Sequence, residues 1–104
     1  MRAVAAEKGV QFLDVRNALN GHEVCNKASS LVSSSPNPVT AEWVRWVNTG
    51  CCQGDAQESL HPNAYGEKAI GKCVQLIYAK TSGNWTCNNT PGQNYNAMWL
   101  ASIP

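Results

Sequence analysis

The sequence ESLHPN at residues 58–63 runs directly into AYGEKAIGKCV at residues 64–74, and this junction decides the fold of the chain. Pro62 suits the first position of a helix, because its φ angle is fixed and its missing N–H would have no partner there. His61 is therefore expected at or next to the N-cap. The positive end of the helix macrodipole favours the neutral imidazole at that place, which is the form that a general base needs.

The helix after Pro62 is predicted to pack one apolar face on a core. Its apolar residues recur at spacings of three and four, as they do along one face of an α-helix. They are Ala69, Ile70, Cys73, Val74 and Ile77. His61 is thus expected to be a polar group on a packed support.

A helix end and a buried strand are predicted near the amino end. Residues 2–8 are alanine-rich, and Gly9 follows them as a C-cap residue should. The largely apolar run VQFLDV at residues 10–15 suits a strand that is covered on both faces in a parallel sheet. A helix that leads into such a strand implies an α/β sandwich. Ligands bind beyond the carboxyl ends of the strands in these sheets, so Asp14 and Arg16 are expected near any active site.

The composition indicates a small secreted domain without a strong electrostatic field. Eight Lys and Arg residues balance seven Asp and Glu residues in 104 residues, so neither nucleic acid nor membrane insertion is expected. No segment is apolar over a transmembrane length. Five cysteines and two glycosylation sequons, Asn84-Trp85-Thr86 and Asn88-Asn89-Thr90, point to an oxidising, extracellular compartment. A tail rich in Asn, Ser and Thr also produces sequons by chance.

The middle of the chain reads as a long loop. Residues 17–57 show no lasting periodicity, and Ser29 to Pro38 has the composition of a linker. Thr40 could cap a short helix that starts at Ala41. A loop of this length in a small domain is usually functional or pinned by cross-links.

The cysteines can supply those cross-links. Closing the long loop would remove chain entropy worth about 3–4 kcal/mol, so Cys25 is predicted to bond Cys51 or Cys52. Cys73, on the last helix, is predicted to bond Cys87. One of the adjacent pair is then left over, free or bonded to another chain. A metal site is not expected, because the chain has no CxxC pair and its two histidines lie at no ligand spacing.

Three stretches resemble the SGNH (GDSL-type) esterases and lipases. An acid three residues before His61, then Pro-Asn, two residues and a glycine, is similar to the final catalytic block of that family. Gly9 to Arg16 and Gly21 to Cys25 are similar to the last strand and the following loop in its secreted branch. The likeness implies that residues 1–80 are the last helix-strand-loop-helix unit of a flavodoxin-like three-layer α/β/α sandwich, with a disulfide-linked loop. Residues 81–104 are expected to form an irregular tail.

The resemblance implies a serine esterase or lipase that acts through an acyl-serine intermediate, without metal or organic cofactor. His61 is then the catalytic base, and Glu58 orients it, with Asp55 as the alternative acid. The family carries its serine in a Gly-Asp-Ser block near the amino terminus, so the nucleophile is expected outside this chain. The string Gly54-Asp55-Ala56 has no hydroxyl. The loop serines lack the strand-to-helix turn that activates a nucleophile. They are Ser29, Ser30, Ser33, Ser34 and Ser35.

The 104 residues alone are therefore expected to be inactive, as the carboxyl-terminal part of a longer precursor whose amino-terminal portion supplies the serine, glycine and asparagine blocks. The substrate implied is a lipid or acylated-sugar ester. His22 is expected to be a hydrogen-bonded loop histidine. The alternative function is a non-catalytic, secreted, disulfide-linked binding module derived from the same fold. The tryptophans could form a sugar-stacking platform, although core or loop-clamp roles are commoner.

Overall fold

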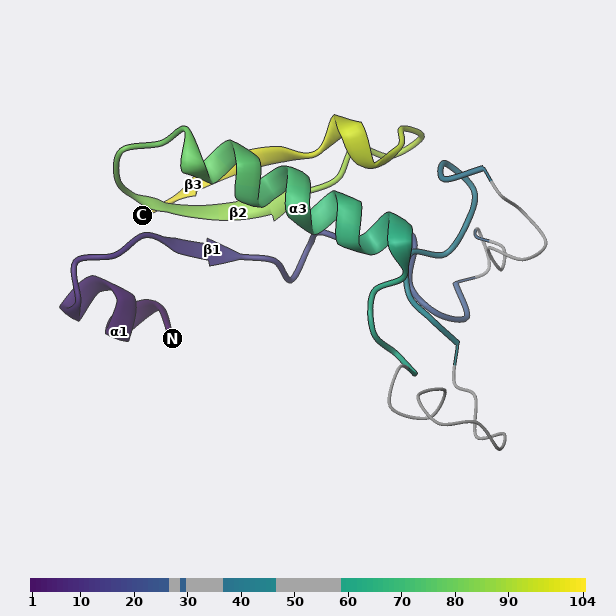
Figure 1. Cartoon of the computed structure of the whole chain (residues 1–104), viewed down its shortest axis with the longest axis horizontal. Coiled ribbons are helices and arrows are strands. Elements are labelled where there is room, and N and C mark those ends of the chain that lie inside the picture. The colour runs from purple at the N-terminus through teal and green to yellow at the C-terminus, as the bar shows by residue number, and fades with distance from the viewer. Residues whose placement is uncertain (27–28, 30–36, 47–58) are drawn as a thin grey trace.

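The computed structural model describes residues 1–26, 29, 37–46 and 59–104, which form a small mixed α/β unit (Figure 1). Within these residues, helices and strands alternate along the chain. The elements are α1 (Arg2–Glu7), β1 (Phe12–Asp14), α3 (Ala64–Tyr78), β2 (Asn84–Asn88), the 3-10 helix η1 (Tyr95–Ala97) and β3 (Trp99–Ile103).

The described strands form one sheet in the order β1-β2-β3. β1 and β2 are parallel, with Leu13 opposite Trp85, and β2 and β3 are antiparallel, with Cys87 opposite Leu100. The chain returns from β1 to β2 through α3, which lies along the sheet (Figure 1). A parallel pair joined through a helix confirms the predicted α/β arrangement.

α1 ends at Glu7 with Lys8 as its C-cap, and Gly9 follows it in the capping position that the sequence predicts. This residue has φ +67°, a left-handed conformation that glycine adopts without the strain of a Cβ atom. The Gly9 N–H donates to the carbonyl of Ala6 (3.2 Å), and the Val10 N–H donates to that of Ala5 (3.0 Å). These two bonds form a Schellman motif and turn the chain into β1.

β1 is shorter and less covered than predicted. Val10 lies before the strand and Val15 after it, and both are exposed. The reason is that β1 is an edge strand of the described sheet, so it pairs only with β2 there. A continuous apolar run suits burial on both faces, but Asp14 is the only residue of this strand that is buried, and Phe12 and Leu13 are half-buried.

α3 begins two residues later than predicted, at Ala64, and Asn63 is its N-cap. The Asn63 Oδ1 atom accepts hydrogen bonds from the N–H groups of Tyr65 (2.9 Å) and Gly66 (3.2 Å). An asparagine side chain satisfies N–H groups at the helix start, and proline cannot do this, so the cap wins over the preference of proline for the first turn. Pro62 instead forms an isolated antiparallel bridge with Val44.

The helix predicted from Ala41 is wrong for residues 41–46, which contain bridge residues at Ala41 and Val44 and a bend at Trp43; we call residues 41–46 the extended segment. The Trp43 N–H donates to the His22 carbonyl (2.9 Å), and the Arg45 N–H donates to the His61 carbonyl (2.8 Å). Distant loops therefore take the backbone groups that a local helix would have used.

The tail is not irregular, because residues 81–104 contain β2, η1 and β3. The disulfide predicted between Cys73 and Cys87 is confirmed, and it ties α3 to the central strand β2. η1 packs on the same helix through stacked rings of Tyr95 and Tyr65, whose centroids lie 5.9 Å apart.

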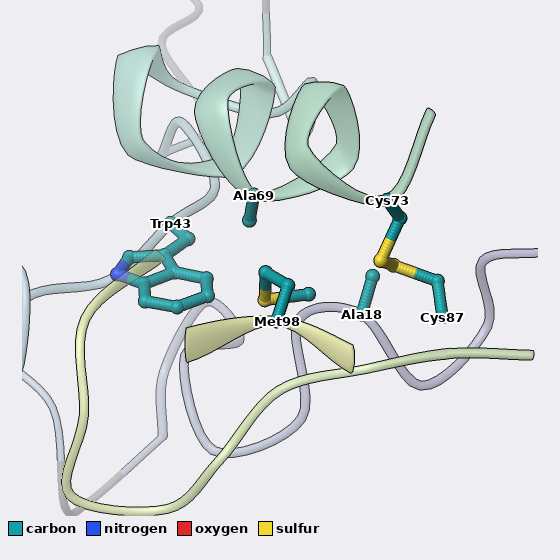
Figure 2. Close-up of a cluster of buried hydrophobic side chains, with 6 residues drawn as sticks. All are labelled: Ala18, Trp43, Ala69, Cys73, Cys87 and Met98. Atoms are coloured by element: carbon teal, nitrogen blue, oxygen red, sulfur yellow. A yellow bond between two sulfur atoms is a disulfide. The ribbon is translucent and has the colours of Figure 1, made fainter. Parts of the chain in front are cut away.

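A compact core lies between α3, the sheet and the loops. Figure 2 shows Trp43, Ala69 and Met98 turned toward one another beneath α3, with the disulfide beside them. Trp43 is fully buried, and its indole N–H donates to the Pro38 carbonyl at 2.8 Å. The six buried members are Ala18, Trp43, Ala69, Cys73, Cys87 and Met98.

Candidate functional site

His61 lies on the surface, two residues before the N-cap of α3. Its carbonyl accepts from the Arg45 N–H at 2.8 Å, and the Leu60 N–H donates to the Arg45 carbonyl at 3.1 Å. Figure 1 places this end of α3 toward the carboxyl ends of β1 and β2. The backbone of His61 is therefore anchored at the side of an α/β sheet where ligands commonly bind.

The turn before His61 is strained. Leu60 has φ +64°, a left-handed conformation that costs an ordinary residue roughly 1–2 kcal/mol. Its side chain is also exposed, so burial of that side chain does not offset the cost. The hydrogen bonds to Arg45 hold this turn and fix the direction in which the chain enters His61.

No hydrogen bond or ion pair reaches the His61 ring from the part of the chain that the structure describes. The acids predicted to orient it, Glu58 and Asp55, lie outside the described residues. The pairing of His61 with either acid therefore stays a prediction.

Asn63 is a site residue that the sequence analysis missed. It is buried, and its Nδ2 atom donates to the Glu42 carbonyl at 2.6 Å while its Oδ1 atom caps α3. One side chain thus joins the His61 segment, the extended segment and the helix. The signal was present, since asparagine is among the best N-cap residues, but the proline rule for the first turn placed the cap earlier.

Gly66 brings α3 onto the extended segment. A Cβ atom at this position would lie 2.2 Å from the Trp43 carbonyl oxygen and 2.9 Å from the Pro62 Cβ atom. Only glycine allows this approach, because real Cβ atoms essentially never come so close to other heavy atoms. Asn63 and Gly66 together fix the segment that carries His61.

Glu42 is a buried carboxylate beside Cys25. Glu42 is only 2% exposed, and its Oε1 atom accepts a hydrogen bond from the Cys25 N–H at 3.1 Å. Its Oε2 atom has no hydrogen-bond partner among the described residues. The Cys25 side chain is exposed and forms no disulfide within the described residues, and its predicted partners, Cys51 and Cys52, lie outside them, so that pairing stays a prediction.

His22 is a hydrogen-bonded loop histidine, as predicted. Its Nδ1 atom lies 2.7 Å from the Ala41 carbonyl oxygen, and its ring stacks on Trp43 with centroids 3.8 Å apart. The residue is 6% exposed and lines a pocket of about 490 Å³. His22 is thus packed against the core and reaches a surface pocket.

Asp14 and Arg16 pair with each other. The Arg16 guanidinium donates to both carboxylate oxygens of Asp14, with an Nη2–Oδ2 distance of 2.6 Å. These hydrogen bonds hold the pKa of the Asp14 carboxyl below its usual value. The pair lines a pocket of about 590 Å³, which Phe12 and Thr86 also line. No hydrogen bond or ion pair joins this pair to His61 in the described ranges.

The predicted absence of a nucleophile rests on residues that the structure describes only in part. Ser29 donates its hydroxyl to the Asn26 carbonyl at 3.2 Å, while Ser30 and residues 33–35 lie outside the described residues. Within the described ranges, no three metal-ligating side chains gather. None of the helices there is long and apolar enough to cross a bilayer. Comparison with protein-family models, with curated proteins and with solved structures finds no match for this chain.

Proposed function

We propose that this chain is the carboxyl-terminal part of a secreted serine ester hydrolase of SGNH type, with His61 as its general base. The observation that carries the proposal is an exposed histidine just before a packed helix, whose amino end lies toward the side of the sheet where the parallel strands β1 and β2 end (Figure 1). The motif around His61 resembles the final catalytic block of that family, and a flavodoxin-like sandwich is the fold that the proposal implies.

In the proposed reaction, a serine from outside these 104 residues attacks the ester carbonyl while His61 takes the hydroxyl proton. The bond to the alcohol then breaks, and His61 returns the proton to that leaving group. Water repeats the two steps on the acyl-serine and releases the acid. Glu58, or Asp55 in its place, holds the second ring nitrogen of His61.

The surroundings of His61 suit this role. A general base has to be held in place while its ring stays accessible, and His61 has an anchored backbone and an exposed side chain. The strained backbone of Leu60 is the kind of local cost that is common at functional positions, and the hydrogen bonds of the Asn63 side chain hold the segment in place. The Cys73–Cys87 disulfide supports secretion, since such bonds persist in oxidising compartments.

Labelling with a fluorophosphonate, which reacts with activated serines, tests the proposal. We expect no labelling of the 104-residue chain and strong labelling of a protein that also contains the polypeptide encoded immediately upstream. Replacing His61 by Ala in the longer protein should abolish the labelling, because the serine then lacks its base. Glu67→Ala, an exposed change in the first turn of α3, is the control and should leave labelling unchanged.

Labelling that persists in the His61→Ala protein would contradict the role of His61. Labelling of the 104-residue chain would show that one of its own serines is activated. If the upstream sequence encodes no such serine and no labelling is found, the chain is better described as the non-catalytic binding module.

A further inference from the structure

The pocket that His22 lines lies where β1 and β2 end, and four of the side chains that line it are asparagine amides. It has a volume of about 490 Å³, within the range of roughly 300–1,000 Å³ that is typical of small-molecule sites. The polar and aromatic residues that line it are Asn17, Asn20, His22, Asn88, Asn89 and Trp99. We call it the asparagine pocket.

The asparagine pocket carries no charged side chain among the described residues that line it. Phosphate and carboxylate ligands are commonly bound by Arg or Lys side chains, and hard cations by carboxylates. None of these side chains is among the residues that line this pocket. A fitting ligand is therefore uncharged, and the amides require that it carry many hydrogen-bonding groups.

Trp99 supplies a flat apolar surface in this pocket. It is 49% exposed, and its indole N–H donates to the Asn89 carbonyl at 3.1 Å. This bond fixes one edge of the ring and leaves an apolar surface in contact with solvent. An indole face of this kind suits the axial C–H groups of a sugar ring, which bury apolar area while the hydroxyl groups point outward.

His22 supplies a preset hydrogen-bond acceptor. Its Nδ1 atom faces the Ala41 carbonyl, so the proton is assigned to Nδ1 and the Nε2 atom of the neutral ring is the acceptor. No described residue bonds Nε2. The His22 ring stacks nearly parallel to the Trp43 indole, with 6° between the two planes, and this contact holds its orientation. The ring is therefore held in one orientation at the wall of the pocket before any ligand binds.

Three of the four asparagine side chains that line the pocket are held by hydrogen bonds before any ligand arrives. Asn88 donates to the Thr86 carbonyl at 3.0 Å, and Asn89 donates to the Asn20 carbonyl. Asn17 lies 3.5 Å from the Asn88 side-chain oxygen. Groups that are fixed in the free protein lose little conformational entropy on binding, which favours even a weakly bound ligand.

We propose that the asparagine pocket binds a neutral pyranose unit of an oligosaccharide. The ring stacks on Trp99, and its hydroxyl groups bond His22 Nε2 and the asparagine side chains. The proposal goes beyond ester hydrolysis and does not depend on His61, because it concerns binding alone.

The test is titration of the ¹⁵N-labelled chain, made in a bacterium so that both sequons stay unmodified, with xylotriose and with cellotriose. We expect saturable shifts of the Trp99 indole N–H and of the Asn17 and Asn20 side-chain amides. Trp99→Ala should weaken binding about fivefold or more, since stacking of a nucleobase on an aromatic side chain contributes about 1–3 kcal/mol and a sugar ring makes a similar contact. Trp46→Ala is the matched control, because Trp46 is 44% exposed and does not line the pocket.

Trp99 is the first residue of β3, so its replacement could also disturb that strand. Asn20→Ala changes an exposed loop residue instead, and it should also weaken sugar binding while the remaining spectrum stays unchanged. Trp99→Phe should retain part of the affinity, since it keeps an aromatic face. The proposal is overturned if neither sugar causes a saturable shift at these groups up to its solubility limit, or if Trp46→Ala and Trp99→Ala weaken binding equally.

Discussion

The contact between α3 and the extended segment can be tested with two glycine substitutions in one helix. Gly66→Ala would place a Cβ atom 2.2 Å from the Trp43 carbonyl oxygen, whereas nothing lies within 4 Å of a Cβ atom at Gly71. The first atom is backbone and cannot rotate away, so the helix has to move outward. This movement would stretch the bond from the Asn63 N–H to the same carbonyl, now 3.0 Å long.

The expected magnitudes follow from these contacts. Overpacking against a fixed group costs up to about 3 kcal/mol, and the weakened bond to Trp43 costs about 1 kcal/mol. Alanine gains at most about 1 kcal/mol over glycine in a helix. Gly66→Ala should therefore lower the free energy of unfolding by about 3 kcal/mol, whereas Gly71→Ala should raise it by about 1 kcal/mol.

Urea unfolding followed by circular dichroism measures both values, and thermal unfolding gives an independent check. A change of 1 kcal/mol shifts the melting temperature by about 4–8 °C in a domain near this size. The two variants should thus move the melting temperature in opposite directions. A Gly66→Ala protein as stable as the Gly71→Ala protein would refute the close approach of α3 to Trp43.

Three further perturbations test the fold. Asn63→Ala should lower the free energy of unfolding by about 2 kcal/mol. The lost N-cap accounts for about 1 kcal/mol, and the lost bond to the Glu42 carbonyl for about 1 kcal/mol; unchanged urea unfolding would contradict both contacts. Reducing the Cys73–Cys87 disulfide, whose cysteines lie 14 residues apart, should lower the free energy of unfolding by about 3 kcal/mol, measured with and without dithiothreitol. Because its folded-state pKa is lowered, chiefly by the Arg16 side chain, Asp14 stabilises the fold above the ordinary aspartate pKa, and this contribution is lost as the pH falls through the lowered value. Asp14→Asn should reduce that loss of stability in acid, and an unchanged pH profile would argue against the pair.

Local signals predicted the parts of the fold that depend on local physics. Gly9 ends α1 because only a residue without Cβ adopts its φ angle without strain, and this requirement is visible in the sequence. The apolar spacing along α3 and the pairing of Cys73 with Cys87 were predicted for similar reasons, since both follow from spacing on one helix and the short chain after it.

The missed parts depend on partners far along the chain. β2 and β3 lie in an asparagine-rich tail that has no strand-like alternation, and β2 pairs in parallel with β1, about 70 residues earlier. Residues 41–46 are extended because their backbone bonds to His22 and His61 replace a local helix. No pattern within the segment itself could reveal those partners.

The sequence likewise predicted only part of the candidate site. The motif identified His61 and its place just before a helix, but not the roles of Asn63 and Gly66, whose importance comes from contacts with Glu42 and Trp43. The asparagine pocket could not be foreseen either, because the strand ends that bring its side chains together were not predicted.

The most direct test of the central proposal is the rate of p-nitrophenyl acetate hydrolysis by this chain joined to the polypeptide encoded upstream, with His61 present or replaced by Ala. The proposal predicts that kcat falls about a thousandfold or more in the His61→Ala protein, because a nucleophile and its base act as a unit. The Cys73–Cys87 disulfide and the circular dichroism spectrum should be unchanged, which separates lost chemistry from lost structure. Undiminished hydrolysis by the folded His61→Ala protein would contradict the proposal.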